Sequence, residues 1–169
     1  MTAMSPFCHR VEIAGSLRRG KSECKDLEIV AQPRTIEKRD MFGEVRSELE
    51  LSELDNCLTT LVDNGVLLTS AKNGERYKQY IICDVHPLKL DLFIVRSPAQ
   101  WGAIYTIRTG PAAFSKKLVT LRRYGGYLPG QFKQKNGALW ENGTLVETPT
   151  EHAYFDVLGL DWITPENRQ

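Results

Sequence analysis

Residues 10–31 read RVEIAGSLRRGKSECKDLEIVA, and this stretch decides the fold that we expect. Residues 10–15 alternate in polarity and end in glycine, which predicts a strand. Residues 16–21 follow a Gly-Ser corner and predict a short helical turn. Residues 26–31 predict a second strand, which Pro33 ends. The strand–turn–strand order fixes where the charged residues of this stretch lie.

The second predicted strand carries two carboxylates, Asp26 and Glu28. Side chains two residues apart in a strand point to the same face, roughly 6.5–7 Å apart. Two carboxylates on one face repel each other unless a positive charge lies between them, and a divalent metal ion is the usual solution. The alternative is that the pair belongs to an exposed edge of an amphipathic strand.

A third carboxylate, Asp91, interrupts an apolar run at residues 88–95 (LKLDLFIV), which predicts a buried strand. A buried carboxylate must be protonated, paired or bound to metal. We expect Lys89 to point to the opposite face, which makes it a poor partner for Asp91. Beside Asp26 and Glu28, Asp91 would complete a site for two magnesium ions, with manganese as a possible substitute. The alternative is a satisfied aspartate at a strand end.

The Gly15-Ser16 corner precedes the first two carboxylates by one short segment. Backbone amides at such a corner can bind phosphate, and glycine lets the phosphate approach closely. Arg18 and Arg19 follow at once, and arginine offers two parallel donors to a phosphate group. The sequence therefore predicts a phosphate site beside the carboxylates.

The rest of the chain predicts a mixed α+β fold. Ser52 and Asp55 resemble a capping box that opens a helix ending at Gly65. A polar loop is expected before it at residues 32–51. Further predictions are strands at 66–70 and 76–83, a helix start at Ser97, a helix from Thr109 to about Tyr124, hairpin turns at Asn136-Gly137 and Asn142-Gly143, and a capped helix after Thr148. We place a boundary near residue 97, between a mixed sheet with helices and a helical part with a small hairpin.

Composition is typical of a globular protein, with 41% hydrophobic and 25% charged residues and a formal net charge of +1. The four cysteines form no C-x-x-C pair, so reduced thiols in a cytoplasmic protein are expected. We find no signal-peptide or membrane-spanning stretch. Basic residues cluster near the start of the chain and again between residues 116 and 135, while acidic residues gather from Glu44 to Asp63. Such polarity suits a polyanionic partner or two solvated faces.

The string GSLRRGKSECKDLEIV, residues 15–30, resembles the signature of the nucleotidyltransferase superfamily. Its doubled arginine is similar to the DNA polymerase X branch, which includes polymerase beta and a very small viral polymerase. The resemblance implies that Ser16 and Arg19 hold an incoming nucleoside triphosphate, with Gly15 and Arg18 beside them. It also implies that Asp26 and Glu28 bind two metals and that Asp91 binds the catalytic one.

The resemblance extends to the C-terminal part of the chain. Thr109-Gly110, followed by Phe114, resembles a segment that contacts the nucleotide, and residues 156–168 (DVLGLDWITPENR) resemble the family's closing helix and tail. Departures are Glu28 in place of an aspartate, Ile107 and Arg108 in place of an aromatic pair, and Ser115 in place of an asparagine. No lyase domain is seen.

These observations predict a palm-like catalytic domain at residues 1–97 and a thumb-like domain at 98–169. The expected function is template-directed DNA synthesis on gapped or primed DNA, as in DNA repair, by a monomer that does not contact membranes. DNA phosphates would be contacted by four basic residues, Lys116, Lys117, Arg122 and Arg123. One alternative is a template-independent enzyme acting on RNA ends, a protein or a small molecule, and another is a non-catalytic nucleic-acid-binding module.

Overall fold

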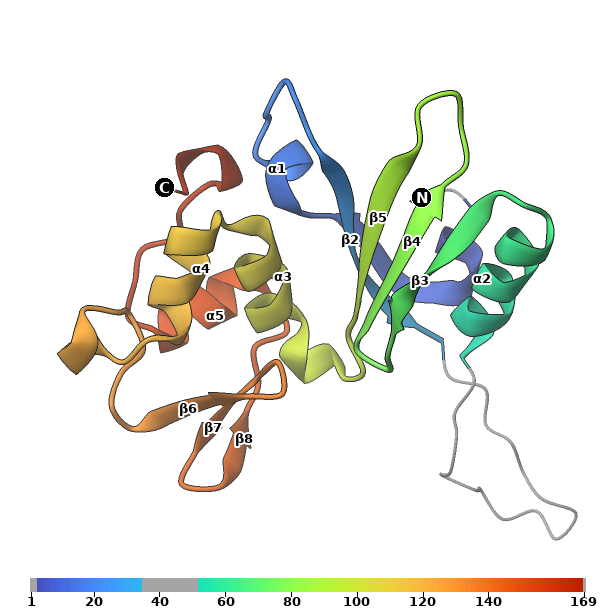
Figure 1. Cartoon of the computed structure of the whole chain (residues 1–169). Coiled ribbons are helices and arrows are strands. Elements are labelled where there is room, and N and C mark those ends of the chain that lie inside the picture. Colours follow the sequence, from blue (N-terminus) through green and yellow to red (C-terminus); the bar gives the residue numbers. More distant parts are fainter. Residues whose placement is uncertain (1–2, 35–51, 169) are drawn as a thin grey trace, which may run out of the picture.

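The computed structural model describes residues 3–34 and 52–168 (Figure 1). Its N-terminal elements are, in chain order, η1 (Ser5–Phe7), β1 (Cys8–Ile13), α1 (Gly15–Arg18), β2 (Asp26–Pro33), α2 (Glu53–Asp63), β3 (Leu67–Asn73), β4 (Tyr77–Ile82) and β5 (Leu88–Ile94). The remaining elements are η2 (Pro98–Gln100), α3 (Trp101–Thr109), α4 (Ala112–Val119), η3 (Arg122–Tyr124), β6 (Phe132–Lys135), β7 (Ala138–Glu141), β8 (Thr144–Val146), α5 (Glu151–Val157) and η4 (Pro165–Asn167).

Within the described residues, strands β1–β5 form one mixed sheet in the order β1-β2-β5-β4-β3, which we call the N-terminal sheet. Strands β2 and β5 pair in parallel, and the other neighbours pair antiparallel. Strands β6, β7 and β8 form a second, antiparallel sheet. Helices cover both sheets, so the predicted α+β class is confirmed.

Several local predictions are confirmed by hydrogen bonds and backbone angles. The Ser52 side chain accepts from the backbone of Asp55, whose carboxylate accepts from the Ser52 backbone, so the capping box of α2 is present. Asn136 and Asn142 both adopt positive φ, as the predicted Asn-Gly turns require. Thr150 caps α5. Most of the predicted loop at residues 32–51 lies outside the described residues.

One helix prediction is wrong in its length. Helix α4 ends at Val119 rather than near Tyr124, because Thr120 has an extended backbone. Leu121 forms an isolated bridge with Leu128, and the backbone amide of Tyr127 donates to the carbonyl of Lys117 at 2.8 Å. The returning chain thus satisfies the end of the helix, and a 3₁₀ turn replaces its continuation.

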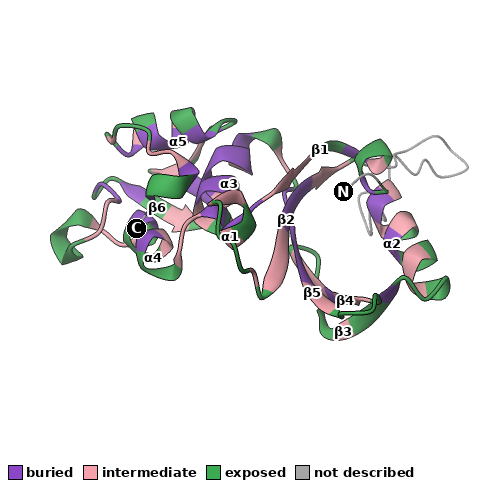
Figure 2. Ribbon diagram, turned by 90° about the horizontal axis from the view of Figure 1, so that it is seen from above, coloured by how far each residue is buried: buried purple, intermediate pink, exposed green. Residues whose placement is uncertain are grey.

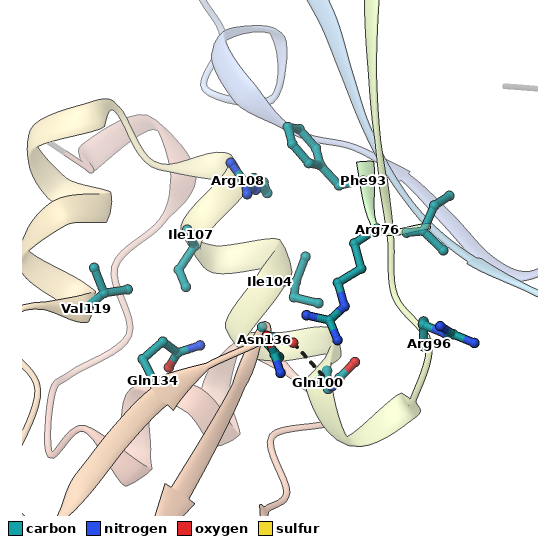
Figure 3. A pocket seen from close by; sticks show the side chains of 12 residues that line it. Arg76, Phe93, Arg96, Gln100, Ile104, Ile107, Arg108, Val119, Gln134 and Asn136 are labelled. Carbon is teal, nitrogen blue, oxygen red and sulfur yellow. Dashed lines mark hydrogen bonds between the residues drawn. The ribbon is translucent and has the colours of Figure 1, made fainter. Parts of the chain in front are cut away.

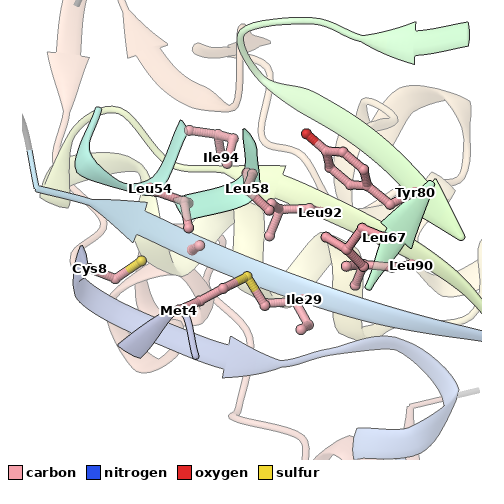
Figure 4. Close-up of a cluster of buried hydrophobic side chains, with 11 residues drawn as sticks. Met4, Cys8, Ile29, Leu54, Leu58, Leu67, Tyr80, Leu90, Leu92 and Ile94 are labelled. Carbon is pink, nitrogen blue, oxygen red and sulfur yellow. The ribbon is translucent and has the colours of Figure 1, made fainter. Parts of the chain in front are cut away.

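The two faces of the N-terminal sheet pack against different helices. On one face, Ile29, Leu92 and Tyr80 pack with Leu54 and Leu58 of α2 to form a buried core (Figure 4). Alternate residues point to the other face, where Val30 and Phe93 pack against Trp101 and Tyr105 of α3. Helix α3 therefore joins the N-terminal sheet to the rest of the chain.

The C-terminal segment, residues 98–168, has its own buried core. Phe114 and Leu118 of α4, Tyr154 and Phe155 of α5, and Leu139 of β7 are almost completely buried. In Figure 2 the ribbon of α3 is largely buried, while that of α5 carries both buried and exposed residues. Helix α3 also contributes to this core through Ala103, so it is packed on two sides.

In the part of the chain that is described, none of the helices combines the length and apolar character that crossing a membrane requires.

Candidate active site

The three candidate carboxylates lie on one face of the N-terminal sheet. In the parallel pairing of β2 with β5, Glu28 lies opposite Asp91 and Asp26 lies opposite Lys89. Alternation along the strands places these four side chains on the face that carries Val30 and Phe93, toward α3. Two segments that are far apart in the sequence thus bring their acidic residues to the same place.

Lys89 lies among these carboxylates, and the expectation that it points away from Asp91 is wrong. It precedes Asp91 by two positions, so strand alternation puts both on the same face. Its Nζ lies 2.8 Å from Asp26 Oδ2 and 3.0 Å from Asp91 Oδ2. The hydrogen bonds that Lys89 donates to the two carboxylates raise the pKa of Lys89. The lysine is therefore a cation that bridges two of the three acids.

Asp91 is the most constrained of the three acids. It is 7% exposed, and its Oδ1 accepts hydrogen bonds from Tyr77 Oη at 2.6 Å and Gln79 Nε2 at 2.8 Å. Burial raises the pKa of Asp91, but the hydrogen bonds from Tyr77, Gln79 and Lys89 outweigh burial, and the net shift is downward. The side chain is thus held as an ionised carboxylate in a fixed orientation. Of the three states considered for a buried Asp91, the structure shows the paired one.

Glu28 has the opposite electrostatic character. Burial raises the pKa of Glu28, the negative charges of Asp26 and Asp91 raise it further, and Arg19 and Arg108 only partly offset this. Its carboxylate lies against Gly15, where an added Cβ would fall 1.7 Å from Glu28 Oε2. Gly15 also has a φ of +62°, which strongly favours glycine. The absence of a side chain at Gly15 therefore leaves the space that the Glu28 carboxylate occupies.

The donor set suits a divalent cation in its chemistry. Three carboxylates supply the hard oxygen ligands that Mg²⁺ and Mn²⁺ prefer. The raised pKa of Glu28 and the bridging position of Lys89 both indicate an excess of negative charge at this place. Over residues 3–34 and 52–168, no three His, Cys, Asp or Glu side chains are already arranged closely enough to hold one ion. Binding would need the acids to rearrange around the ion.

The two arginines of the Gly-Ser turn are bound to the C-terminal segment. Arg18 donates to Thr109 Oγ1 at 2.7 Å and to both carboxylate oxygens of Glu151, at 2.9 and 2.6 Å. Its guanidinium also lies 3.8 Å from the centre of the Tyr105 ring. Arg19 donates to the backbone carbonyl of Thr109 at 2.6 Å. The structure thus brings the predicted phosphate turn next to the Thr109-Gly110 segment.

Glu151 belongs to this cluster, although its contacts were not predicted from the sequence. Besides Arg18 it accepts from Arg168 Nη1 at 2.8 Å, and the Arg168 side chain is fully buried. Burial raises the pKa of Glu151, but the two arginines outweigh burial and the net shift is downward. The sequence offered little indication of these contacts, because Glu151 is also the residue type expected in the first turn of a capped helix.

A pocket of about 320 Å³ opens between the N-terminal sheet and the C-terminal segment (Figure 3). Three arginines line it, Arg76, Arg96 and Arg108, together with the amides Gln100, Gln134 and Asn136. Arg108 lies 4.0 Å from the centre of the Phe93 ring, and burial lowers its pKa, partly offset by Glu28. The pocket is therefore lined by both basic and apolar side chains, and through Phe93 it lies on the same side of the sheet as the carboxylates.

The four basic residues proposed for DNA all lie on the surface of the C-terminal segment. Lys116 and Lys117 are exposed in the last turn of α4, and Arg122 and Arg123 are exposed in η3. Arg122 Nη2 donates to the carbonyl of Leu158 at 2.6 Å, so part of its guanidinium is used inside the fold. The Lys117 ammonium group lies 5.7 Å from the centre of the Tyr127 ring, and the Arg123 guanidinium lies 4.9 Å from the centre of the Tyr124 ring.

The geometry defines a cluster of acids on a mixed sheet, with Lys89 and Arg19 beside it and Arg108 approaching from the second part of the chain. In a comparison with protein families, residues 106–169 match the family model of the DNA polymerase beta thumb. The match supports the polymerase beta-like relationship suggested by the sequence, and it does so for the C-terminal part of the chain.

Proposed function

We propose that this chain is a metal-dependent nucleotidyltransferase that joins a nucleoside monophosphate from a triphosphate to a 3′-hydroxyl. The observation that carries the proposal is the register of β2 and β5, which puts Asp26, Glu28 and Asp91 on one face beside the Gly15-Ser16 turn. In this proposal residues 1–97 form the palm-like catalytic domain and residues 98–169 the thumb-like domain.

The three acids would hold the metal ions. Asp26 and Glu28 on β2 would supply ligands from one strand, and Asp91 on β5 would supply them from its neighbour. When bound, two Mg²⁺ or Mn²⁺ ions would lower the pKa of that hydroxyl and stabilise charge on the phosphates. Tyr77 and Gln79 would keep Asp91 ionised and oriented, since both donate to the same oxygen.

The triphosphate would bind between the Gly15-Ser16 turn and the Thr109-Gly110 segment. Arg19 suits phosphate better than Arg18, because it donates one hydrogen bond within the described residues and keeps further N–H donors. Arg18 is committed to Glu151 and Thr109. We therefore assign Arg19 to the phosphates and Arg18 to holding the two sides of the site together.

The acceptor is proposed to be DNA. The match of residues 106–169 to the DNA polymerase beta thumb supports a polymerase-like function that involves DNA. Lys116, Lys117 and Arg123 present exposed charge suited to phosphates, and Arg108, which lines the pocket, acts electrostatically on Glu28. The proposed reaction is template-directed synthesis on gapped or primed DNA.

The test is extension of a labelled primer across a one-nucleotide gap, with each nucleotide supplied singly and Mg²⁺ present. The matched control is Asp91→Asn, which keeps the size of the side chain and removes its charge. We expect addition of the complementary nucleotide only, and no addition by the variant. Equal addition of all four nucleotides would indicate a template-independent transferase. No addition to DNA, to RNA ends or to a protein acceptor would contradict the proposal and favour a binding module.

A further inference from the structure

Lys89 occupies an unusual place for a lysine. Its ammonium group lies within 3.0 Å of carboxylate oxygens from two different strands, Asp26 on β2 and Asp91 on β5. The lysine side chain is 38% exposed, while the Asp91 side chain is 10% exposed. The buried acid is thus fixed in place, and the cation approaches it from the solvent side on a long, flexible stem.

The ammonium group and a divalent ion would compete for the same oxygens. A Mg²⁺ ion needs carboxylate oxygens at about 2.0–2.1 Å, so an ion shared by Asp26 and Asp91 would lie close to where the ammonium group now lies. Two cations cannot occupy that space, because they repel each other and the carboxylate lone pairs between them are already used. One cation must leave before the other can bind.

The Lys89 side chain can move more easily than the Asp91 carboxylate that it contacts. Asp91 is held by Tyr77 and Gln79, which donate to its Oδ1, while Lys89 contacts its Oδ2. Withdrawal of the lysine would free Oδ2 of Asp26 and Oδ2 of Asp91. The hydrogen bonds from Tyr77 and Gln79 to Asp91 Oδ1 would stay intact. The half-exposed position of Lys89 gives its side chain room to withdraw into solvent.

We propose that Lys89 is a built-in counter-ion, which holds Asp26 and Asp91 together without metal and leaves them when a divalent ion binds. This rests on the metal site of the proposed function. Lys89 is then a positioning residue that sets the metal concentration at which the site fills. It also prevents the repulsion that would otherwise act on the acids of an unloaded site.

The test is a titration of the protein with Mn²⁺ alone. The electron paramagnetic resonance signal of the free ion measures how much Mn²⁺ remains unbound. Lys89→Met removes the charge and keeps the length of the side chain, and Lys89→Arg keeps the charge. We expect Lys89→Met to bind Mn²⁺ about three- to tenfold more tightly than the wild type, the range for losing one partly exposed competing charge. Lys89→Arg should stay close to the wild type.

The matched control is Lys78→Met. Lys78 lies on the opposite face of β4 and pairs with Asp55 of α2 at 3.1 Å, so its loss also removes a lysine–aspartate pair but leaves the proposed site alone. We expect it to leave Mn²⁺ affinity unchanged. In EDTA both methionine variants should melt below the wild type. Saturating Mn²⁺ should abolish or reverse the deficit of Lys89→Met only.

The outcomes separate the two proposals. Mn²⁺ binding to the wild type that is lost in Asp91→Asn but unchanged in a folded Lys89→Met would overturn the role of Lys89 and leave the metal site standing. Absence of binding to the wild type and to Lys89→Met would overturn both. Binding seen only after the lysine is removed would support the counter-ion, because it shows the lysine excluding the metal.

Discussion

Arg18 and Glu151 form a two-pronged ion pair between the turn that precedes β2 and the first residue of α5, 133 positions further along the chain. Arg168 joins the same carboxylate from the C-terminal end. Three parts of the chain therefore meet at one buried acid, next to the residues to which we assign phosphate binding. Four variants test what this arrangement and the neighbouring carboxylates do.

Glu151→Gln should lower the free energy of unfolding by about 2–4 kcal/mol, because it leaves the buried Arg168 and the partly buried Arg18 without a counter-charge. The pKa of Glu151 is lowered from its ordinary value of 4.5 in the folded chain. Its charge therefore stabilises the fold above about that pH and loses this effect as the pH falls further. Denaturant unfolding at pH 7 and at pH 4 should show the difference between wild type and variant shrinking in acid.

The control for Glu151 is Glu75→Gln. Glu75 also forms an ion pair with an arginine, Arg96, at 2.7 Å, but its side chain is 80% exposed. Exposed pairs are worth little, so a change within about 0.5 kcal/mol is expected. Equal losses in the two variants would contradict a special role for the buried cluster.

Gly15→Ala should abolish nucleotidyl transfer and reduce stability. A methyl group at position 15 would collide with the Glu28 carboxylate and would require a positive φ from alanine. Gly20→Ala is the matched control, since Gly20 also has a positive φ, of 73°, but nothing lies within 4 Å of its added Cβ. Backbone strain alone costs about 1–2 kcal/mol, so Gly20→Ala should lose stability but keep activity. Gap-filling assays measure the activity of both variants, and thermal melts measure their stability. Equal activity in the two variants would contradict the steric role of Gly15.

Glu28→Gln should make the metal-free protein more stable near neutral pH while abolishing activity. The pKa of Glu28 is raised above 4.5 by burial and by the neighbouring acids, so the folded state favours the protonated side chain. Ionisation therefore costs stability as the pH rises above the ordinary range of a glutamate. Thermal melts in EDTA from pH 4 to pH 8 should show the melting temperature of the variant rising relative to that of the wild type as the pH increases. A difference in melting temperature that stays constant across this range would rule out the repulsion that we infer.

Arg19→Ala should raise the apparent KM for the incoming nucleotide by about tenfold, as expected for loss of one charge-assisted contact to phosphate. The fold should remain, since Arg19 makes one described hydrogen bond, to Thr109. Lys21→Ala is the control, because Lys21 is exposed in the same turn. Steady-state gap filling measures both. An unchanged KM in Arg19→Ala would remove the proposed role of this residue.

The parts predicted well from the sequence are those that depend on local rules. Strand alternation placed Asp26 and Glu28 on one face, and the Ser52 and Asp55 pattern gave a capped helix. The same rule, applied correctly, would have put Lys89 beside Asp91, so that error was one of counting and not of missing information. The end of α4 was misjudged because a bridge between Leu121 and Leu128 decides it.

Other features depend on contacts between distant segments and had no local signal. The pairing of β2 with β5 in register aligns Glu28 with Asp91, and no sequence period reports that register. The buried Arg168 and its bond to Glu151 likewise arise only when the C-terminal residues fold back over α5. Arg108 was noted as a departure from the family pattern, and its stacking on Phe93 depends on how α3 lies over the sheet.

Thr109 is held twice, by Arg18 through its hydroxyl and by Arg19 through its carbonyl. A movement of the end of α3 away from the Gly-Ser turn must break both bonds together, since they end on one residue. Opening of this side of the molecule would then break both bonds to Thr109 in a single step, while Arg18 would still be held by Glu151. An anion that draws Arg19 away from Thr109 would leave Arg18 as the remaining link from the Gly-Ser turn to Thr109.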